Sequence, residues 1–279
     1  MKKTIKECIN ENIYKLEQAG IENARLNAEL IMCKVLNINR TDLIFKFSNE
    51  ISTYENQKKF DVLIKRRALR EPLQYIEEKV KFYDLDIIIN NDVLIPRPET
   101  EELVDIIIKS TDKNNVKNIL DIGTGSGCIS LVLAKYFHNS NIIGIDKSQK
   151  AIKIAAQNKK NLNFKNIQFI NIGIEDFNIS NDVDIIVSNP PYVSKFEYEK
   201  LDEELYFEPK IAITDNEDGL YFYKIIYDKI QSIKNNSYKL FFEIGYEQFK
   251  DIRNIFQGFE CRLIKDMNNK DRFICLKQC

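Results

Sequence analysis

Strand-like and helix-like segments alternate along the chain from residue 115 onward. Short apolar runs over residues 116–122, 141–145, 167–171 and 183–187 have the length and the β-branched content of buried strands. Helical patterns separate the first three of these runs. Parallel strands need crossover connections of this kind, and the crossovers are usually helices. The alternation therefore predicts an α/β fold, with a mostly parallel sheet covered by helices on both faces.

The two ends of the chain follow other patterns. Residues 2–70 contain no strand signal and carry apolar residues at helical spacing, which predicts a small helical domain. Residues 261–265 and 272–276 are strand-like and flank a short polar turn, which predicts a closing antiparallel hairpin. The expected parts are a helical domain over 1–72, a linker with a β-hairpin over 73–98, and an α/β domain over 99–279.

A glycine-rich turn, Asp121-Ile122-Gly123-Thr124-Gly125-Ser126-Gly127, follows the first predicted strand. Glycine lets a ligand approach the backbone, and a strand–turn–helix frame is where nucleotide-like ligands bind. Asp146 ends the next strand, about twenty residues on, where a carboxylate accepts hydrogen bonds from ribose hydroxyls. The turn matches neither the dinucleotide fingerprint nor the phosphate loop, which disfavours NAD and ATP. S-adenosylmethionine remains, with a turn that serves only helix–strand packing as the alternative.

A second constrained stretch, Asn189-Pro190-Pro191-Tyr192, stops the fourth predicted strand. Proline lacks an N–H and fixes φ, so strand pairing cannot continue past Asn189. The Asn189 side-chain oxygen and the Pro190 carbonyl are both acceptors, and together they can hold an NH2 group by its two hydrogens. The ring of Tyr192 can stack on the flat group that carries this NH2. An ordinary strand-ending turn is the alternative interpretation.

Composition disfavours several classes of protein. Among 279 residues, 41 Lys and Arg balance 42 Asp and Glu, so the formal net charge of −1 creates no overall field that attracts nucleic acid. No apolar run approaches membrane-spanning length, and six scattered cysteines suit reduced thiols in the cytoplasm. The single histidine, His138, gives little support to metal catalysis or to a histidine-activated nucleophile, so no metal site is expected.

These motifs resemble the class I S-adenosylmethionine-dependent methyltransferases, and more closely the release-factor glutamine N5-methyltransferases of the HemK/PrmC family. The resemblance covers nearly the whole chain, and its most specific motif is Ile95-Pro96-Arg97-Pro98-Glu99-Thr100-Glu101. The glycine turn is shared by the whole class, whereas Asn-Pro-Pro-Tyr is shared by several amino-group methyltransferases. Further matching stretches are Ala24 to Glu29, Glu71 to Ile76, Glu208-Pro209, Asp218 to Leu220 with Phe222-Tyr223, and Glu243 to Tyr246.

The resemblance implies a Rossmann-like sheet of seven strands and transfer of a methyl group from S-adenosylmethionine to the side-chain amide nitrogen (N5) of a glutamine. The implied substrate is the Gly-Gly-Gln motif of peptide-chain release factors, recognised by the helical domain. A cytoplasmic monomer without membrane contact or a nucleic-acid substrate is also implied.

The same resemblance assigns roles to residues of the two motifs and of the Pro-Arg-Pro segment. The expected catalytic residues are Asn189, Pro190 and Tyr192. The expected cofactor-binding residues are Asp121, Gly123, Thr124, Gly125, Ser126, Gly127, Asp146, Ile174 and Asn189. The expected substrate-binding residues are Asn189, Pro190, Pro191, Tyr192, Arg97 and Glu99.

Two positions depart from the family pattern. Glu77-Glu78 stand where the family usually has a glycine. After the third strand, Gly173-Ile174 stand where the family tends to place an acidic residue and a large apolar one against the adenine. Glu175 or Asp176 are the alternative sources of that carboxylate.

Other activities fit the same pair of acceptors. An N6-adenine methyltransferase acting on DNA or RNA would bind an exocyclic NH2 on a flat ring, but the balanced charge disfavours it. Methylation of a glutamine in another protein is a further alternative. A cofactor-binding regulator with a degenerate site is the non-catalytic alternative, and the intact Asn-Pro-Pro-Tyr motif disfavours it.

Overall fold

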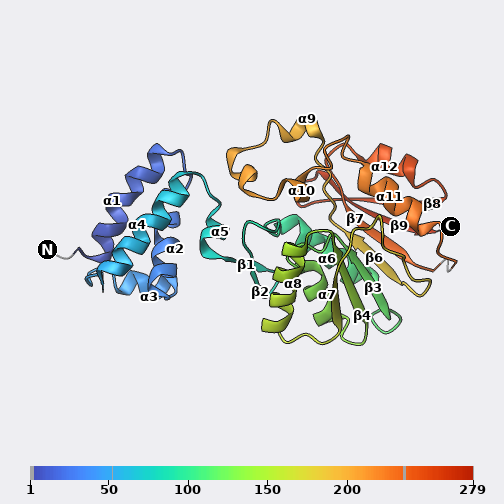
Figure 1. Cartoon of the computed structure of the whole chain (residues 1–279), viewed down its shortest axis with the longest axis horizontal. Helices are drawn as coiled ribbons and strands as arrows, with labels where there is room; N and C mark the ends of the chain where they lie inside the picture. Colours follow the sequence, from blue (N-terminus) through green and yellow to red (C-terminus); the bar gives the residue numbers. More distant parts are fainter. Residues whose placement is uncertain (1–2, 52, 235–236, 279) are drawn as a thin grey trace. The chain divides into compact units, whose positions relative to one another are not determined.

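The computed structural model describes residues 3–51, 53–234 and 237–278. The chain forms two compact units (Figure 1). One, the helical unit, consists of Met1–Lys79 and Asp202–Phe207, and the other, the sheet unit, consists of Val80–Leu201 and Glu208–Cys279. The sequence pattern indicated a helical domain that ends near residue 72. It did not indicate that Asp202–Phe207 would belong to the same unit.

The helical unit packs its helices around one apolar core, as the helical periodicity of residues 2–70 predicted. The core contains Ile9, Leu16, Ile31 and Phe60, each at most 1% exposed. Thr4 starts the first helix with a capping box, which satisfies backbone N–H groups that the helix leaves unpaired. The elements are α1 (Ile5–Gln18), α2 (Ala24–Leu36), α3 (Arg40–Phe45), α4 (Tyr54–Ala68), α5 (Leu73–Glu77) and the 3-10 turn η1 (Glu203–Phe207).

A buried arginine connects three parts of the helical unit. Arg67 on α4 is 6% exposed, and its guanidinium donates to Asn27 Oδ1 on α2 at 2.7 Å. It also donates to the Glu71 carbonyl at 3.0 Å and to Glu204 Oε1 at 2.8 Å. A buried guanidinium needs partners for its donors, so this set holds Asp202–Phe207 to the helices.

The sheet unit contains the seven-stranded sheet that the resemblance implied. Its strand order is β5-β4-β3-β6-β7-β9-β8. The first five strands in this order are parallel, and β9 pairs antiparallel with both β7 and β8. The strands are β3 (Asn118–Ile122), β4 (Asn141–Asp146), β5 (Ile167–Asn171), β6 (Ile185–Ser188), β7 (Lys239–Glu243), β8 (Phe259–Lys265) and β9 (Asp271–Gln278).

Helices cover both faces of this sheet (Figure 1). On one face α6 contacts β7, α7 contacts β4, and α8 contacts β4 and β5. On the other face α11 and α12 pack on an apolar cluster that includes Tyr223, Phe242 and Phe256. The helices are α6 (Pro98–Ser110), α7 (Cys128–Tyr136), α8 (Gln149–Asn161), α11 (Tyr221–Ile230) and α12 (Phe249–Ile255). The predicted α/β layers are therefore confirmed.

The strand order reverses beside β3, because the chain continues to β4 and β5 on one side and then returns to β6 on the other. In open α/β sheets, ligands bind outside the carboxyl ends of the strands at such a reversal. The two motifs singled out in the sequence follow β3 and β6. The topology therefore places them side by side.

Smaller elements complete the sheet unit. The predicted hairpin is formed by β1 (Lys79–Phe82) and β2 (Leu85–Ile88), and Lys79 itself belongs to the helical unit. Two short helices, α9 (Lys195–Tyr198) and α10 (Lys210–Ile213), lie between Tyr192 and α11, where the sequence pattern indicated no element. No helix of the described residues is long and apolar enough to cross a membrane. Five cysteines are free, and Cys279 lies outside the described residues.

A pair of substitutions on α4 tests the core of the helical unit. Ile64 is 1% exposed and Val62 is 48% exposed. Ile64→Ala leaves a cavity and should lower the free energy of unfolding of this unit by about 2–5 kcal/mol. Val62→Ala should change it by less than about 1 kcal/mol. Hydrogen exchange of the α1 and α2 amides in the full chain measures both, and equal loss of protection would contradict the assigned core.

Candidate active site

The glycine turn begins where β3 ends and leads into α7. Gly127 has a φ of +82°, and a Cβ on it would lie 2.8 Å from the Phe169 ring. Only glycine therefore allows this turn to pack on β5. Gly123, by contrast, borders open space, because a Cβ there would meet nothing within 4 Å. The turn is therefore packed against β5 at Gly127 and borders open space at Gly123.

Asp121 supports the turn from below. It is fully buried, and its Oδ2 accepts hydrogen bonds from Thr124 Oγ1 at 2.7 Å and from Ser130 Oγ at 2.6 Å. Its Oδ1 has no hydrogen-bond partner among the described residues. Burial raises the pKa of this carboxyl from its ordinary value of 3.8 to about 6, although the two hydroxyls act against the rise. Asp121 and Thr124 shape the turn without lining the pocket above it.

Asp146 lies at the carboxyl end of β4, beside the turn. Its two side-chain oxygens accept hydrogen bonds from the backbone N–H of Gly125 at 2.9 Å and of Ser148 at 2.8 Å. Burial raises the pKa of Asp146. Each carboxylate oxygen has a further lone pair, so Asp146 can still accept from a ligand hydroxyl. This residue orients the turn and also contributes an acceptor to the pocket.

One pocket lies at the carboxyl ends of these strands, and residues of the sheet unit line it. Predicted site residues that line it are Gly123, Gly125, Asp146, Ile174, Asn189, Pro190 and Pro191. Predicted site residues outside its lining are Asp121, Thr124, Ser126, Gly127, Tyr192, Arg97 and Glu99. The pocket is therefore lined by residues of both the glycine turn and the Asn-Pro-Pro-Tyr motif.

The lining includes further residues. Val93 and Leu94 precede the Pro-Arg-Pro segment, and Phe222 is the second residue of α11. Pro209, from a stretch that matches the family, lines the pocket as well, and Glu175 does so whereas Asp176 does not. Val93 is an apolar residue that the sequence did not single out. Its proximity to the glycine turn follows from tertiary folding, and no local signal marks it.

A serine joins the two motifs at the floor of the pocket. Ser188, the last residue of β6, donates from Oγ to the Ile122 carbonyl at the end of β3, with a distance of 2.7 Å. Ser188 is fully buried. The bond fixes the start of the Asn189 loop relative to the start of the glycine turn.

The Asn189 loop is held by a chain of polar contacts. The side-chain NH2 of Asn189 donates to Thr100 Oγ1 at 3.0 Å, and that hydroxyl donates to Glu243 Oε2 at 2.7 Å. The Tyr192 hydroxyl donates to the other carboxylate oxygen, Oε1, at 3.1 Å. Burial raises the pKa of Tyr192, so its phenol remains protonated and able to donate. Thus Glu243, at the end of β7, holds Tyr192 directly and Asn189 through the Thr100 hydroxyl.

Backbone contacts fix the loop after Tyr192. Gln248 Nε2 donates to the Tyr192 carbonyl at 2.9 Å, and its Oε1 accepts from the Gly245 N–H at 2.8 Å. Gly219 has a φ of +80°, and a Cβ on it would lie 2.3 Å from the Tyr192 carbonyl oxygen. Glycine is therefore required at this close approach.

The Pro-Arg-Pro segment is anchored to residue 208. The Arg97 guanidinium donates to Glu208 Oε1, and the other oxygen, Oε2, accepts from the Ile95 N–H at 2.9 Å. Glu208 is 4% exposed, so this pairing satisfies a buried carboxylate. Its neighbour Pro209 lines the pocket. Arg97, expected to bind substrate, thus pairs with Glu208, the residue before Pro209 of the pocket lining.

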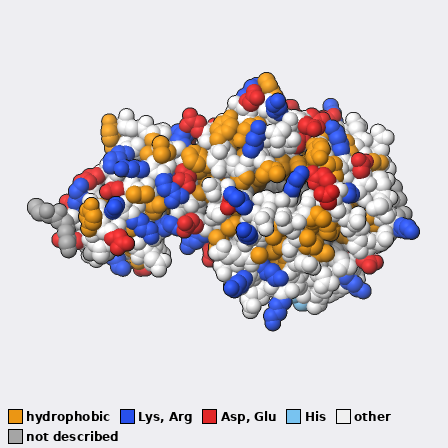
Figure 2. All heavy atoms as spheres, viewed as in Figure 1, with side chains coloured by type: hydrophobic (Ala, Val, Ile, Leu, Met, Phe, Trp, Pro, Cys, Tyr) orange, Lys and Arg blue, Asp and Glu red, His pale blue; other side chains and the backbone are white. Residues whose placement is uncertain are grey.

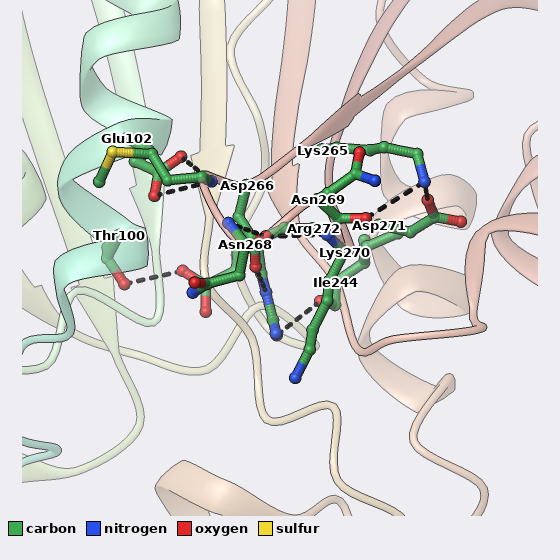
Figure 3. A network of polar contacts seen from close by, with 12 residues as sticks. Thr100, Glu102, Ile244, Lys265, Asp266, Asn268, Asn269, Lys270, Asp271 and Arg272 are labelled. Atoms are coloured by element: carbon green, nitrogen blue, oxygen red, sulfur yellow. Dashed lines mark hydrogen bonds and ion pairs between the residues drawn. The ribbon is translucent and has the colours of Figure 1, made fainter.

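A second polar network surrounds the turn between β8 and β9 (Figure 3). Asp266 accepts from the N–H of Asn268 and of Lys270, both at 2.9 Å. Arg272 lies beside it and donates to the Ile244 carbonyl at 3.3 Å. The same guanidinium is 3.4 Å from the Tyr192 hydroxyl. Arg272 and Glu243 therefore contact the same Tyr192 hydroxyl.

Comparison with known proteins places this geometry in a family. Residues 7–77 match the model of the PrmC N-terminal domain, and residues 112–217 match a methyltransferase domain. A release factor glutamine methyltransferase of Fusobacterium nucleatum is 39% identical over 98% of this chain and 78% of its own length. One of Buchnera aphidicola is 38% identical over 96% of both chains. The solved catalytic domain of hMettl16 shares the fold, with a TM-score of 0.56 and 16% identity over 77% of this chain and 81% of its own.

The fold, the glycine turn and the matched domain define a class I S-adenosylmethionine-dependent methyltransferase. Within that class, the chain belongs to the release factor glutamine methyltransferase family.

The residues of the pocket fit the cofactor of this class. Gly123 leaves open space above the turn, and Asp146 offers a free lone pair for ribose hydroxyls. Ile174 and Phe222 are apolar residues of the lining, as the surface against a flat base would need to be. Within the described residues, no group of three or more His, Cys, Asp and Glu side chains could hold a metal ion.

Asp121→Asn should remove a pH-dependent part of the stability of the sheet unit. The pKa of Asp121 is about 6 in the folded chain and 3.8 ordinarily. Folding therefore favours the protonated form, and this stabilisation is full below pH 3.8 and lost as pH rises through about 6. Between about pH 3 and 7, wild type should lose about 3 kcal/mol relative to Asp121→Asn. Chemical denaturation measures the difference, and a constant difference would contradict a buried titrating carboxyl.

Asp146→Ala should weaken S-adenosylmethionine binding, because it removes a charged acceptor from the pocket. The expected loss is about ten- to hundredfold in Kd, the range of hydrogen bonds to charged groups. Calorimetry with the free protein measures it. Asp176→Ala is the matched control, since Asp176 is exposed and lies outside the pocket lining. An unchanged Kd for Asp146→Ala would count against its ribose role.

Proposed function

We propose that this protein transfers a methyl group from S-adenosylmethionine to the side-chain amide nitrogen of a glutamine in a peptide-chain release factor. The observation that carries the proposal is the position of Asn189 and Pro190 in the same pocket as Gly123 and Asp146. An acceptor pair for an NH2 group thus lies beside a nucleoside site. The relatives named for this activity support the same substrate class.

The chain supplies acceptors for both hydrogens of the substrate amide. The NH2 of Asn189 is used by Thr100, so its Oδ1 remains as an acceptor, and the Pro190 carbonyl is the second acceptor. Two bonds to its hydrogens orient the amide nitrogen and oppose delocalisation of its lone pair into the carbonyl. Positioning of this kind accelerates a reaction without a strong base.

When bound, S-adenosylmethionine supplies an electrophilic methyl group on a sulfonium. The nitrogen gains this methyl, the carbon–sulfur bond breaks, and the amide proton then leaves to solvent because the methylated nitrogen is cationic. A base near neutral pKa is therefore not needed, which suits a pocket that has no histidine in its lining.

We further propose that the substrate segment is Gly-Gly-Gln and that the helical unit binds the body of the release factor. Glycines beside the glutamine would let the backbone approach Pro190 and Pro191 closely. Because release factors act on ribosomes, the expected place of action is the cytoplasm. A monomer suffices on this proposal, since residues of one chain line the pocket.

Charge supports a protein substrate over a nucleic acid. Basic and acidic side chains are interspersed on the face drawn in Figure 2. The formal net charge of the chain is −1. A nucleic-acid enzyme uses a basic surface to neutralise phosphates, and its binding weakens steeply with salt.

Incubation of the protein with labelled S-adenosylmethionine and purified release factors tests the proposal. Mass spectrometry should locate the label on the glutamine of Gly-Gly-Gln. In parallel incubations with DNA, RNA and ribosomal proteins, label on adenine, or on a ribosomal protein only, would overturn it.

Asn189→Ala should lower kcat at least about 100-fold, as loss of a positioned hydrogen-bonding group does in other enzymes. The Kd for S-adenosylmethionine should stay within about threefold, since acceptors such as Asp146 remain. Asn178→Ala, in an exposed loop, is the control. Normal turnover by Asn189→Ala would contradict the role of this side chain.

A further inference from the structure

Two buried residues lie behind the Asn189 side chain. Thr100, in the first turn of α6, is 2% exposed, and Glu243, at the end of β7, is 1% exposed. The contacts run from Asn189 Nδ2 to Thr100 Oγ1 at 3.0 Å and from Thr100 Oγ1 to Glu243 Oε2 at 2.7 Å. The Thr100 hydroxyl points into the network drawn in Figure 3.

The available hydrogens determine which group donates and which accepts in these two hydrogen bonds. A hydroxyl has one hydrogen to donate, and an ionised carboxylate only accepts. The Thr100 hydrogen is therefore directed to Glu243, and the Thr100 oxygen can only accept. Of the two ends of the Asn189 amide, only the NH2 can donate to it, so Oδ1 must face the other way.

The direction matters because the two ends of an amide have nearly the same shape. Packing alone does not decide which end of Asn189 faces the pocket. A flipped amide would direct its own NH2 toward the NH2 of a substrate, and two donors cannot hydrogen-bond to each other. Half of the acceptor pair would then be lost.

Glu243 has further partners that stabilise its ionised form. The Tyr192 hydroxyl donates to Oε1 at 3.1 Å, and the Arg272 guanidinium lies 3.4 Å from that hydroxyl. Burial raises the pKa of Glu243 on balance, and the hydroxyls of Thr100 and Tyr192 and the charge of Arg272 act against this rise. The carboxylate thus accepts two hydroxyl hydrogens beside a positive charge.

We propose that Thr100 and Glu243 are positioning residues that hold the Asn189 amide with its oxygen toward the substrate. They act on methyl transfer through Asn189 and contact neither substrate nor cofactor. This inference rests on the proposed function for its effect on catalysis, whereas the orientation of the amide can be tested without any substrate.

Three threonine variants form the first test. Thr100→Val keeps the shape and removes the hydroxyl, so kcat should fall about ten- to hundredfold, with KM for the release factor and Kd for S-adenosylmethionine nearly unchanged. Thr100→Ser restores the hydroxyl and should recover most of the lost kcat. Thr111→Val is the matched control, because Thr111 caps the other end of α6 and its hydroxyl has no partner among the described residues.

Glu243→Gln is the second test, because it replaces one acceptor oxygen by a donor. Gln keeps its oxygen on the Tyr192 hydroxyl, which has no other acceptor in this network, and directs its NH2 to Thr100. Thr100 then accepts from Gln, and its hydrogen, which has lost its acceptor on residue 243, is satisfied when it donates to the Asn189 oxygen, which turns that oxygen inward. The expected loss of kcat is at least that of Thr100→Val.

A spectroscopic readout separates this inference from the proposed function. In 15N-labelled free protein, one Asn189 side-chain N–H should be shifted and protected from solvent exchange, with Asn189→Ala identifying the signal. Thr100→Val and Glu243→Gln should abolish that protection, and Thr100→Ser should keep it. Unchanged Asn189 signals in Thr100→Val, or full kcat in that variant, would overturn the inference. Absence of methyl transfer by wild type would instead overturn the proposed function, and the spectra would still decide the orientation.

Discussion

The parallel pairing of β3 with β4 on one side and with β6 on the other is the constraint on which the site depends. Because these strands point the same way, the segments that follow them meet at one edge of the sheet. The glycine turn, Asp146 and Asn189 are distant in sequence and share one pocket for this reason. The bond from Ser188 to the Ile122 carbonyl then fixes the two loops relative to each other.

Buried carboxylates organise the loops around this pocket, and each does so by accepting hydrogen bonds. Asp121 holds the glycine turn through two hydroxyls, and Glu243 holds the Asn189 loop through two more. Glu208 holds the Pro-Arg-Pro segment through Arg97 and a backbone N–H. Burying charge is costly unless every charge is partnered, so these contacts favour one arrangement of the loops over looser ones. A rigid pair of acceptors is what a poor nucleophile such as an amide requires.

The chain passes between the two units near Lys79 and again on both sides of Asp202–Phe207. After Leu201 the chain enters the helical unit, where Glu204 pairs with buried Arg67, and it returns to the sheet unit at Glu208. The next residue, Pro209, lines the pocket. The stretch that contributes Pro209 to the pocket lining is therefore continuous with a stretch held by the unit that we propose binds the release factor.

The sequence alone determined the layers of the fold and the centre of the site. The alternation of short β-branched strands with helices, the glycine turn and the two prolines after Asn189 depend on local backbone chemistry, which a sequence pattern displays directly. Tertiary structure decided the rest. Thr100 and Glu243 are 143 positions apart, the apolar lining residue Val93 belongs to no motif, and residues 202–207 join the helices from a distant part of the chain. Such contacts depend on how the whole chain packs, and no local pattern encodes which distant side chain will complete a buried hydrogen bond.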